Sequence, residues 1–97
     1  MRIINAGKLR IFGERHRDAK DQAWAWYYDV QVAEWKKPIT IKRQYRTADV
    51  LADNRVVFNI KGNRYRIVVR INYEKQLVDI RFTGTHAEYD RIDATTI

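Results

Sequence analysis

The chain has 97 residues, with 19 Lys and Arg against 12 Asp and Glu, and a formal net charge of +7 at pH 7. A chain of this length is expected to form one domain, residues 1–97, with a modest hydrophobic core. The lack of cysteine excludes thiol catalysis, disulfides and cysteine-ligated metal. No apolar run approaches the ~20 residues of a membrane span, so we expect a cytoplasmic protein without a membrane partner.

The positive charge is concentrated in one part of the chain. Ten Lys and Arg lie between Lys36 and Arg70, where Asp49 and Asp53 are the only acidic residues. A concentrated positive field on a small domain is typical of proteins that bind polyanions, and nucleic acid is the leading candidate.

The N-terminal third predicts a short strand and two helices. MRII predicts a strand at residues 1–4, and Asn5 is a plausible N-cap for a helix from about Ala6 to Arg17. A second helix is expected from Ala19 to about Trp35, with a core stripe of Ala23, Trp26, Tyr27, Val30 and Ala33. A second stripe of Trp24, Tyr28, Gln31 and Trp35 is too apolar for a purely solvated face, so it belongs to the core or contacts a partner.

Pro38 is expected to stop helical structure. Residues 39–54 therefore read as a basic irregular connection, with at most one turn near residues 47–51. Five cations lie in this region or just before it: Lys36, Lys37, Lys42, Arg43 and Arg46. They either contact phosphates of RNA or belong to a solvated loop.

From Arg55 the hydrophobic period changes to two. This predicts three strands at about residues 55–61, 64–73 and 76–83, joined by two-residue turns at Gly62-Asn63 and Glu74-Lys75. The expected fold is α+β: two N-terminal helices packed on a mainly antiparallel sheet, followed by a short C-terminal helix.

These turns fix an expected register. Val56, Phe58 and Ile60 then face Val69, Ile67 and Tyr65 to make an apolar sheet face for the helices to cover. The other face has Lys61 opposite Arg64, and the rungs Asn59, Arg66 and Thr83; Val57, Val68 and Arg81; and Arg55, Arg70 and Asp79. We expect an ion pair between Arg70 and Asp79. Arg66 and Arg81 have no acid in their rungs, which favours an anion-binding role for both.

The stretch TGTHAEYD predicts a short helix with a T-x-x-E capping box formed by Thr85 and Glu88. His86 is then the first helical residue, and Tyr89 follows on the same helix face. The pair fits either a packing detail at a helix start or a catalytic pair in which a neutral imidazole acts as the base and the phenol as a donor.

These groups together suggest RNA cleavage without a metal or other cofactor. The ribose 2′-hydroxyl is the nucleophile, one group takes its proton, Arg66, Arg81 and Lys61 hold the phosphate, and another group protonates the leaving oxygen. The predicted surface has no cluster of carboxylates or histidines, so no metal site is expected.

Two segments resemble a known family. VFNIKGNRYRIVVRINYEKQLVDIRF and TGTHAEYD are similar to the HigB toxins of bacterial type II toxin–antitoxin modules, a branch of the RelE/ParE-like superfamily, over about residues 35–90. The resemblance implies an mRNA interferase that acts with the translating ribosome. It also implies neutralisation by a HigA-type antitoxin with a helix-turn-helix domain, through which alone DNA is contacted.

The resemblance places Asn63, Arg66, His86 and Tyr89 in the family's signature segments, whereas Lys61, Arg64 and Arg81 come from the face assignment. Of these seven residues, Asn63 and Arg64 are expected to bind RNA and the other five to act in catalysis. We choose His86 as the general base, and the sequence leaves Tyr89 or Lys61 open. Two other functions are also open: a gyrase poison of the ParE type and a non-catalytic RNA-binding module.

Overall fold

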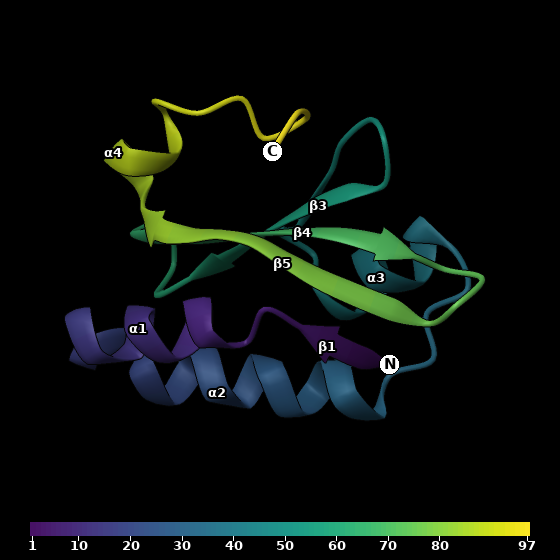
Figure 1. Ribbon diagram of the computed structural model, residues 1–97, viewed down its shortest axis with the longest axis horizontal. Coiled ribbons are helices and arrows are strands. Elements are labelled where there is room, and N and C mark those ends of the chain that lie inside the picture. Colours follow the sequence, from purple (N-terminus) through teal and green to yellow (C-terminus); the bar gives the residue numbers. More distant parts are fainter.

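The computed structural model describes residues 1–97 and has a five-stranded sheet with helices on both faces. In chain order the elements are β1 Arg2–Ile4, α1 Gly7–Arg15, α2 Arg17–Val32, α3 Pro38–Gln44, β2 Asp49–Val50, β3 Arg55–Ile60, β4 Tyr65–Asn72, β5 Leu77–Thr85 and α4 His86–Tyr89. The strand order is β1-β5-β4-β3-β2, and only the β1–β5 pair is parallel. Figure 1 shows α1 and α2 below the sheet and α4 above it. The predicted α+β class is confirmed.

The main core lies between the two N-terminal helices and the sheet. Phe58 of β3 packs against Trp26 of α2, with ring centroids 5.3 Å apart, and stacks on Trp35 at 5.9 Å. The β3–β4 register is the predicted one: Phe58 lies opposite Ile67, and Asn59 lies opposite Arg66. Because side chains alternate along a strand, Arg66 points to the face away from α1 and α2.

The expectation of an irregular connection after Pro38 is wrong. Pro38 is the first residue of α3, where its missing N–H and fixed φ suit a helix start, and residues 49–50 form the edge strand β2. Ile41 of α3 is completely buried in the main core, so packing against the sheet stabilises a helix that its sequence alone does not predict.

Both hairpin loops are longer than predicted. Ile60 pairs with Tyr65, so the first loop has four residues, and two of them, Lys61 and Gly62, have positive φ angles of 54° and 64°. Lys61 and Arg64 therefore form no rung of the sheet. The second loop likewise spans residues 73–76 and ends with Gln76 at φ 54°.

A bulge between Val68 and Val69 corrects the predicted β4–β5 register. Arg70 still pairs with Asp79, but Val68 lies opposite Phe82 and Arg66 opposite Gly84, so Arg81 and Thr83 leave their expected rungs. The face expected to be mainly basic instead carries a second apolar cluster: Val57, Val68 and Ala94, with Leu51, Phe82, Tyr89 and Ile97 packed against them. The segment after α4 runs back over this face, as Figure 1 shows in yellow.

The second apolar stripe of α2 is only partly exposed. The helix ends at Val32, and Trp35 is 1% exposed within the main core, so the expectation that Trp35 could contact a partner is wrong. Tyr28 is 61% exposed, and its ring lies 6.4 Å from that of the half-buried Trp24. None of the helices has the length and apolarity that crossing a membrane requires.

Candidate functional site

The short helix α4 is fixed in place by the predicted capping box. Thr85 Oγ1 accepts the Glu88 backbone N–H at 3.1 Å, and Glu88 Oε1 accepts the Thr85 backbone N–H at 2.9 Å. The hydrogen bond from Thr85 lowers the pKa of Glu88. The backbone N–H of His86 also donates to the Arg64 carbonyl oxygen at 2.8 Å, which ties α4 to the start of β4.

Gly84 leaves the space that this arrangement needs. A Cβ at position 84 would lie 2.8 Å from Cζ of Phe82 and 2.9 Å from Oε1 of Glu88. Both distances are too short for real contacts, so any side chain would displace the capping box or the ring beneath α4. A glycine at this point of β5 therefore sets the position of His86 and Tyr89 relative to the sheet.

His86 has a carboxylate partner that the sequence analysis missed. Its Nδ1 lies 3.0 Å from Oδ2 of Asp90, four residues later, and both side chains are substantially exposed. An aspartate at Nδ1 favours the tautomer with the proton on that nitrogen, leaving the Nε2 lone pair free to accept a proton. The sequence could have predicted this pair, because side chains four residues apart lie next to each other on one helix face.

Arg66 is buried and held in position. Its guanidinium donates from Nη1 to the Asn63 carbonyl oxygen at 2.8 Å and from Nη2 to Asn63 Oδ1 at 2.6 Å, and the residue is only 7% exposed. The Cζ atom lies 5.7 Å from the centre of the Tyr89 ring, within cation–π range. No carboxylate pairs with it, as expected. Removing Arg66 would break both hydrogen bonds to Asn63 and the contact with the Tyr89 ring, so we expect its loss to destabilise the fold.

Tyr89 rests between Arg66 and Phe82, whose ring centroid is 6.4 Å away. Burial raises the pKa of the Tyr89 phenol, and the negative charge of Asp49 on β2 raises it further. The phenol therefore keeps its proton at neutral pH and acts as a hydrogen-bond donor, which favours His86 over Tyr89 as the base. The carboxylate of Asp49 is a second neighbour of the site that sequence reasoning missed, because only the tertiary fold brings β2 near α4.

The other residues that were expected to act in catalysis make no contact with His86, Arg66 or Tyr89. Arg81 has no acid across from it in the sheet, but it forms an ion pair at 2.9 Å with Asp79, two residues earlier on β5, so it is not the unpaired cation that we expected. The side chain of Lys61 is exposed and makes no hydrogen bond or ion pair, while its backbone N–H donates to Gln22 of α2. Arg64, expected to bind RNA, points toward α2 and lies 3.6 Å from Asp18.

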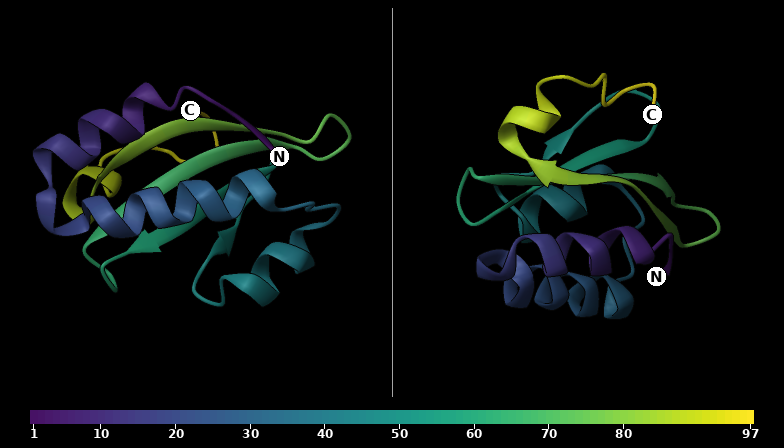
Figure 2. Two further views of the ribbon diagram at one scale, coloured as in Figure 1. Left: turned by 90° about the horizontal axis from the view of Figure 1, so that it is seen from below. Right: turned by 60° about the vertical axis from the view of Figure 1, so that its left-hand side comes forward.

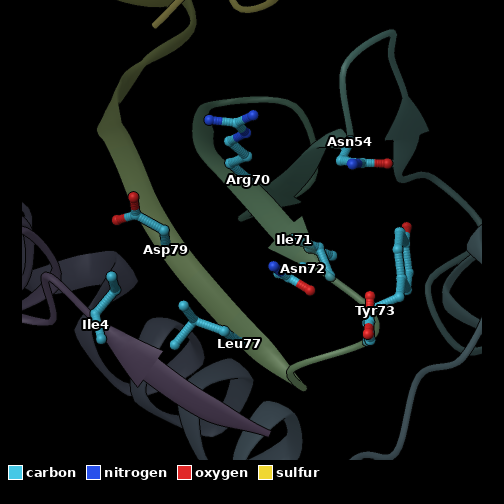
Figure 3. A pocket seen from close by; sticks show the side chains of 9 residues that line it. Ile4, Asn54, Arg70, Ile71, Asn72, Tyr73, Leu77 and Asp79 are labelled. Carbon is cyan, nitrogen blue, oxygen red and sulfur yellow. The ribbon is translucent and has the colours of Figure 1, made fainter.

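The expected ion pair between Arg70 and Asp79 is absent, although the two residues pair in register. Asp79 is occupied by Arg81 and by Asn5, whose Nδ2 donates to it at 2.5 Å. Figure 3 shows the Asp79 carboxylate turned away from the guanidinium of Arg70, across a hollow of about 500 Å³ at the end of β4 and β5 distant from α4. Arg70 is exposed and unpaired, and it lies at the end of the sheet distant from α4, which carries His86 and Tyr89.

The cations expected to bind RNA phosphates lie on α3 and its flanks. We call Lys36, Lys37, Lys42, Arg43 and Arg46 the α3 cations, and all five are exposed. Figure 2 shows, on the left, that α3 and α4 lie at opposite ends of the molecule. In the whole chain, no three His, Asp or Glu side chains come close enough together to hold a metal ion.

Comparisons with known proteins agree with the resemblance carried by the strands and α4. The family model HigB_toxin, described as the RelE-like toxic component of a toxin–antitoxin system, matches residues 19–92. The chain is 30% identical over 92 residues to the mRNA interferase toxin HigB of Escherichia coli (strain K12), which covers 93% of this chain and 88% of that protein. The mRNA interferases HigB of Escherichia coli O157:H7 and Shigella flexneri show the same identity and coverage.

Proposed function

Because the chain belongs to the HigB family of RelE-like toxins from toxin–antitoxin systems, we propose that it is an mRNA interferase, an endoribonuclease that cuts mRNA and so inhibits translation. The observation that carries the proposal is the group around α4. This group combines a histidine held by Asp90, a protonated phenol and a guanidinium that no carboxylate neutralises. These are the parts that metal-independent cleavage of a phosphodiester needs.

The reaction we propose uses the 2′-hydroxyl of the substrate as the nucleophile. Nε2 of His86 takes the hydroxyl proton, the 2′-oxygen forms a bond to phosphorus, and the bond from phosphorus to the 5′-oxygen breaks. The leaving 5′-oxygen receives a proton, so the products are a 2′,3′-cyclic phosphate and a 5′-hydroxyl end. We assign that proton to Tyr89, whose phenol is protonated at neutral pH.

Arg66 is proposed to stabilise the negative charge that develops on the phosphate oxygens. Asn63 holds one edge of the guanidinium, and the Tyr89 ring lies against it, so the charge is in place before the substrate binds. Arg81 is less suited to this role, because Asp79 already neutralises it. Lys61 and Arg64 remain candidates for contacts with flanking phosphates, since both are exposed.

A toxin of this family has an antitoxin partner. We propose that the partner is of the HigA type, with a helix-turn-helix domain, and that this chain contacts DNA only through it. Trp24 and Tyr28 remain our candidates for a hydrophobic anchor on α2, where their side chains reach the surface. The α3 cations are proposed to contact phosphates of ribosomal RNA in the cytoplasm, which would make ribosome binding salt-dependent.

The test is to induce wild-type protein and His86→Ala in growing cells and to map the ends of cellular mRNA. We expect wild type to cut mRNA, and His86→Ala to lose cleavage by ~10²- to 10⁴-fold, the usual worth of general acid–base catalysis, while still binding ribosomes. Intact mRNA with induced DNA damage would instead indicate gyrase poisoning. Bound but uncut RNA would indicate a non-catalytic RNA-binding module.

A further inference from the structure

A groove between α3 and β2 combines apolar walls with a cationic rim. Its volume is about 520 Å³, and it is lined by Pro38, Ile39, Lys42, Asp49, Val50 and Leu51, which we call the α3–β2 groove. Ile39 is 52% exposed and Val50 is 44% exposed. These two large apolar side chains come from different elements, so the exposed surface is a product of the fold and not of one local run.

The surroundings of the groove are strongly positive. Lys42 lines it, the other α3 cations lie on the same helix and its flanks, and Asp49 is the only acidic residue between Lys36 and Val50. Lys42 is fixed at its wall, where Nζ donates to the Ala48 carbonyl oxygen at 2.5 Å. Phosphate groups could neutralise these cations, but they would make no favourable contact with the apolar side chains of Ile39 and Val50. An apolar centre with a charged rim is instead the pattern of a protein interface.

The groove also ends on an open edge of the sheet. β2 has two residues, pairs only with β3, and is the last strand in the order. Backbone groups on such an edge are available to a partner chain in extended conformation. An extended segment could therefore pair with β2 and place alternate side chains over Ile39 and Val50.

We propose that the α3–β2 groove binds an extended segment of the antitoxin in which apolar side chains are flanked by carboxylates. The proposal rests on the proposed function, which makes the antitoxin the partner of this chain. The apolar side chains would cover Ile39 and Val50, and the carboxylates would pair with the α3 cations. The antitoxin would then compete directly with ribosomal RNA for these cations, which gives it a means of keeping the toxin off the ribosome without touching His86.

The experiment compares Ile39→Ser/Val50→Ser with Ile11→Ser, a matched control at an apolar position on α1 that is 48% exposed. All three side chains reach the surface, so the variants are expected to fold. Binding to the purified antitoxin of the same module is measured by calorimetry at two salt concentrations, and hydrogen exchange at residues 49–51 is followed with and without that antitoxin.

We expect the double variant to weaken antitoxin binding by ~30-fold or more, because two apolar side chains lose their burial at the interface, and we expect the control to leave it unchanged. Residues 49–51 should gain protection from hydrogen exchange on antitoxin binding only in the wild-type protein. Ribosome binding and mRNA cleavage by the double variant should equal those of wild type. Unchanged antitoxin binding, or a loss of ribosome binding in its place, would overturn the proposal. So would a dimer of this chain that the double variant abolishes, because a second copy would then occupy the groove. If wild type cuts no mRNA while antitoxin binding still depends on Ile39 and Val50, the proposed function fails and this inference stands.

Discussion

Replacing Asn63 by aspartate would separate the charge of Arg66 from its role in packing. Oδ1 of Asn63 already accepts from Nη2 of Arg66 at 2.6 Å, so a carboxylate of nearly the same shape can make the same contact. The buried guanidinium would gain a paired charge and keep its hydrogen bonds. We therefore expect Asn63→Asp to fold with a thermal midpoint equal to or above that of wild type.

The effect on RNA should be large in spite of the intact fold. A phosphate held by the guanidinium would lie roughly 6 Å from the new carboxylate, and at an effective dielectric constant of about 20 their repulsion is about 3 kcal/mol. Screening by salt reduces this value, so we expect cleavage efficiency and RNA affinity to fall by about 10- to 100-fold.

The control is Asn63→Ala, which keeps the charge of Arg66 and removes a hydrogen bond to it. Loss of such a bond costs about 1.5–3 kcal/mol, which for a domain of this size lowers the thermal midpoint by roughly 6–20 °C. The assays are thermal denaturation, ribosome binding and mRNA cleavage on ribosomes. Wild-type cleavage by a well-folded Asn63→Asp variant would refute the assignment of Arg66 to the reacting phosphate.

Four further predictions concern the same molecule. Asp90→Asn should lower cleavage by about tenfold or more at unchanged ribosome affinity, and the nitrogen NMR signals of His86 should show a changed tautomer population; an unchanged spectrum would remove Asp90 from a positioning role. Gly84→Ala should destabilise the fold by about 1–3 kcal/mol in chemical denaturation, and a neutral effect would mean that Phe82 and Glu88 adjust freely. Folding lowers the pKa of Glu88, so the contribution of its carboxylate to stability is present above the usual pKa of 4.5 and is lost as the pH falls through the lower pKa of the folded state. Glu88→Gln should therefore remove this part of the dependence of the unfolding free energy on pH in the acidic range only, which denaturation at several pH values will show. Neutralising Lys36, Lys37 and Arg43 should reduce the slope of log ribosome affinity against log salt by about 0.7 for each phosphate that these side chains neutralise in wild type, and an identical slope would make this region a solvated surface.

Local patterns of the sequence determined the elements with strong periodicity. Alternating apolar residues from Arg55 onward predicted three strands, and the pairing of Phe58 with Ile67 and of Arg66 with Asn59 followed from their spacing across one turn. The capping box at Thr85 and Glu88 could be read directly, because its two hydrogen bonds join residues three apart. His86 and Tyr89 were found in the same way.

The tertiary structure decided which side chains meet across elements. Helix α3 forms because Ile41 is buried against the core, and no local pattern around Pro38 shows that burial. The bulge after Val68 turns Phe82 toward Tyr89, which a strict alternation of side chains cannot predict. Arg66 was expected to be a free surface charge, yet Asn63 and Tyr89 enclose it once the loop and α4 fold over β4. Periodicity and capping depend on neighbours a few residues apart, so the sequence carries them openly, whereas burial and pairing between distant segments depend on the packing of the whole chain.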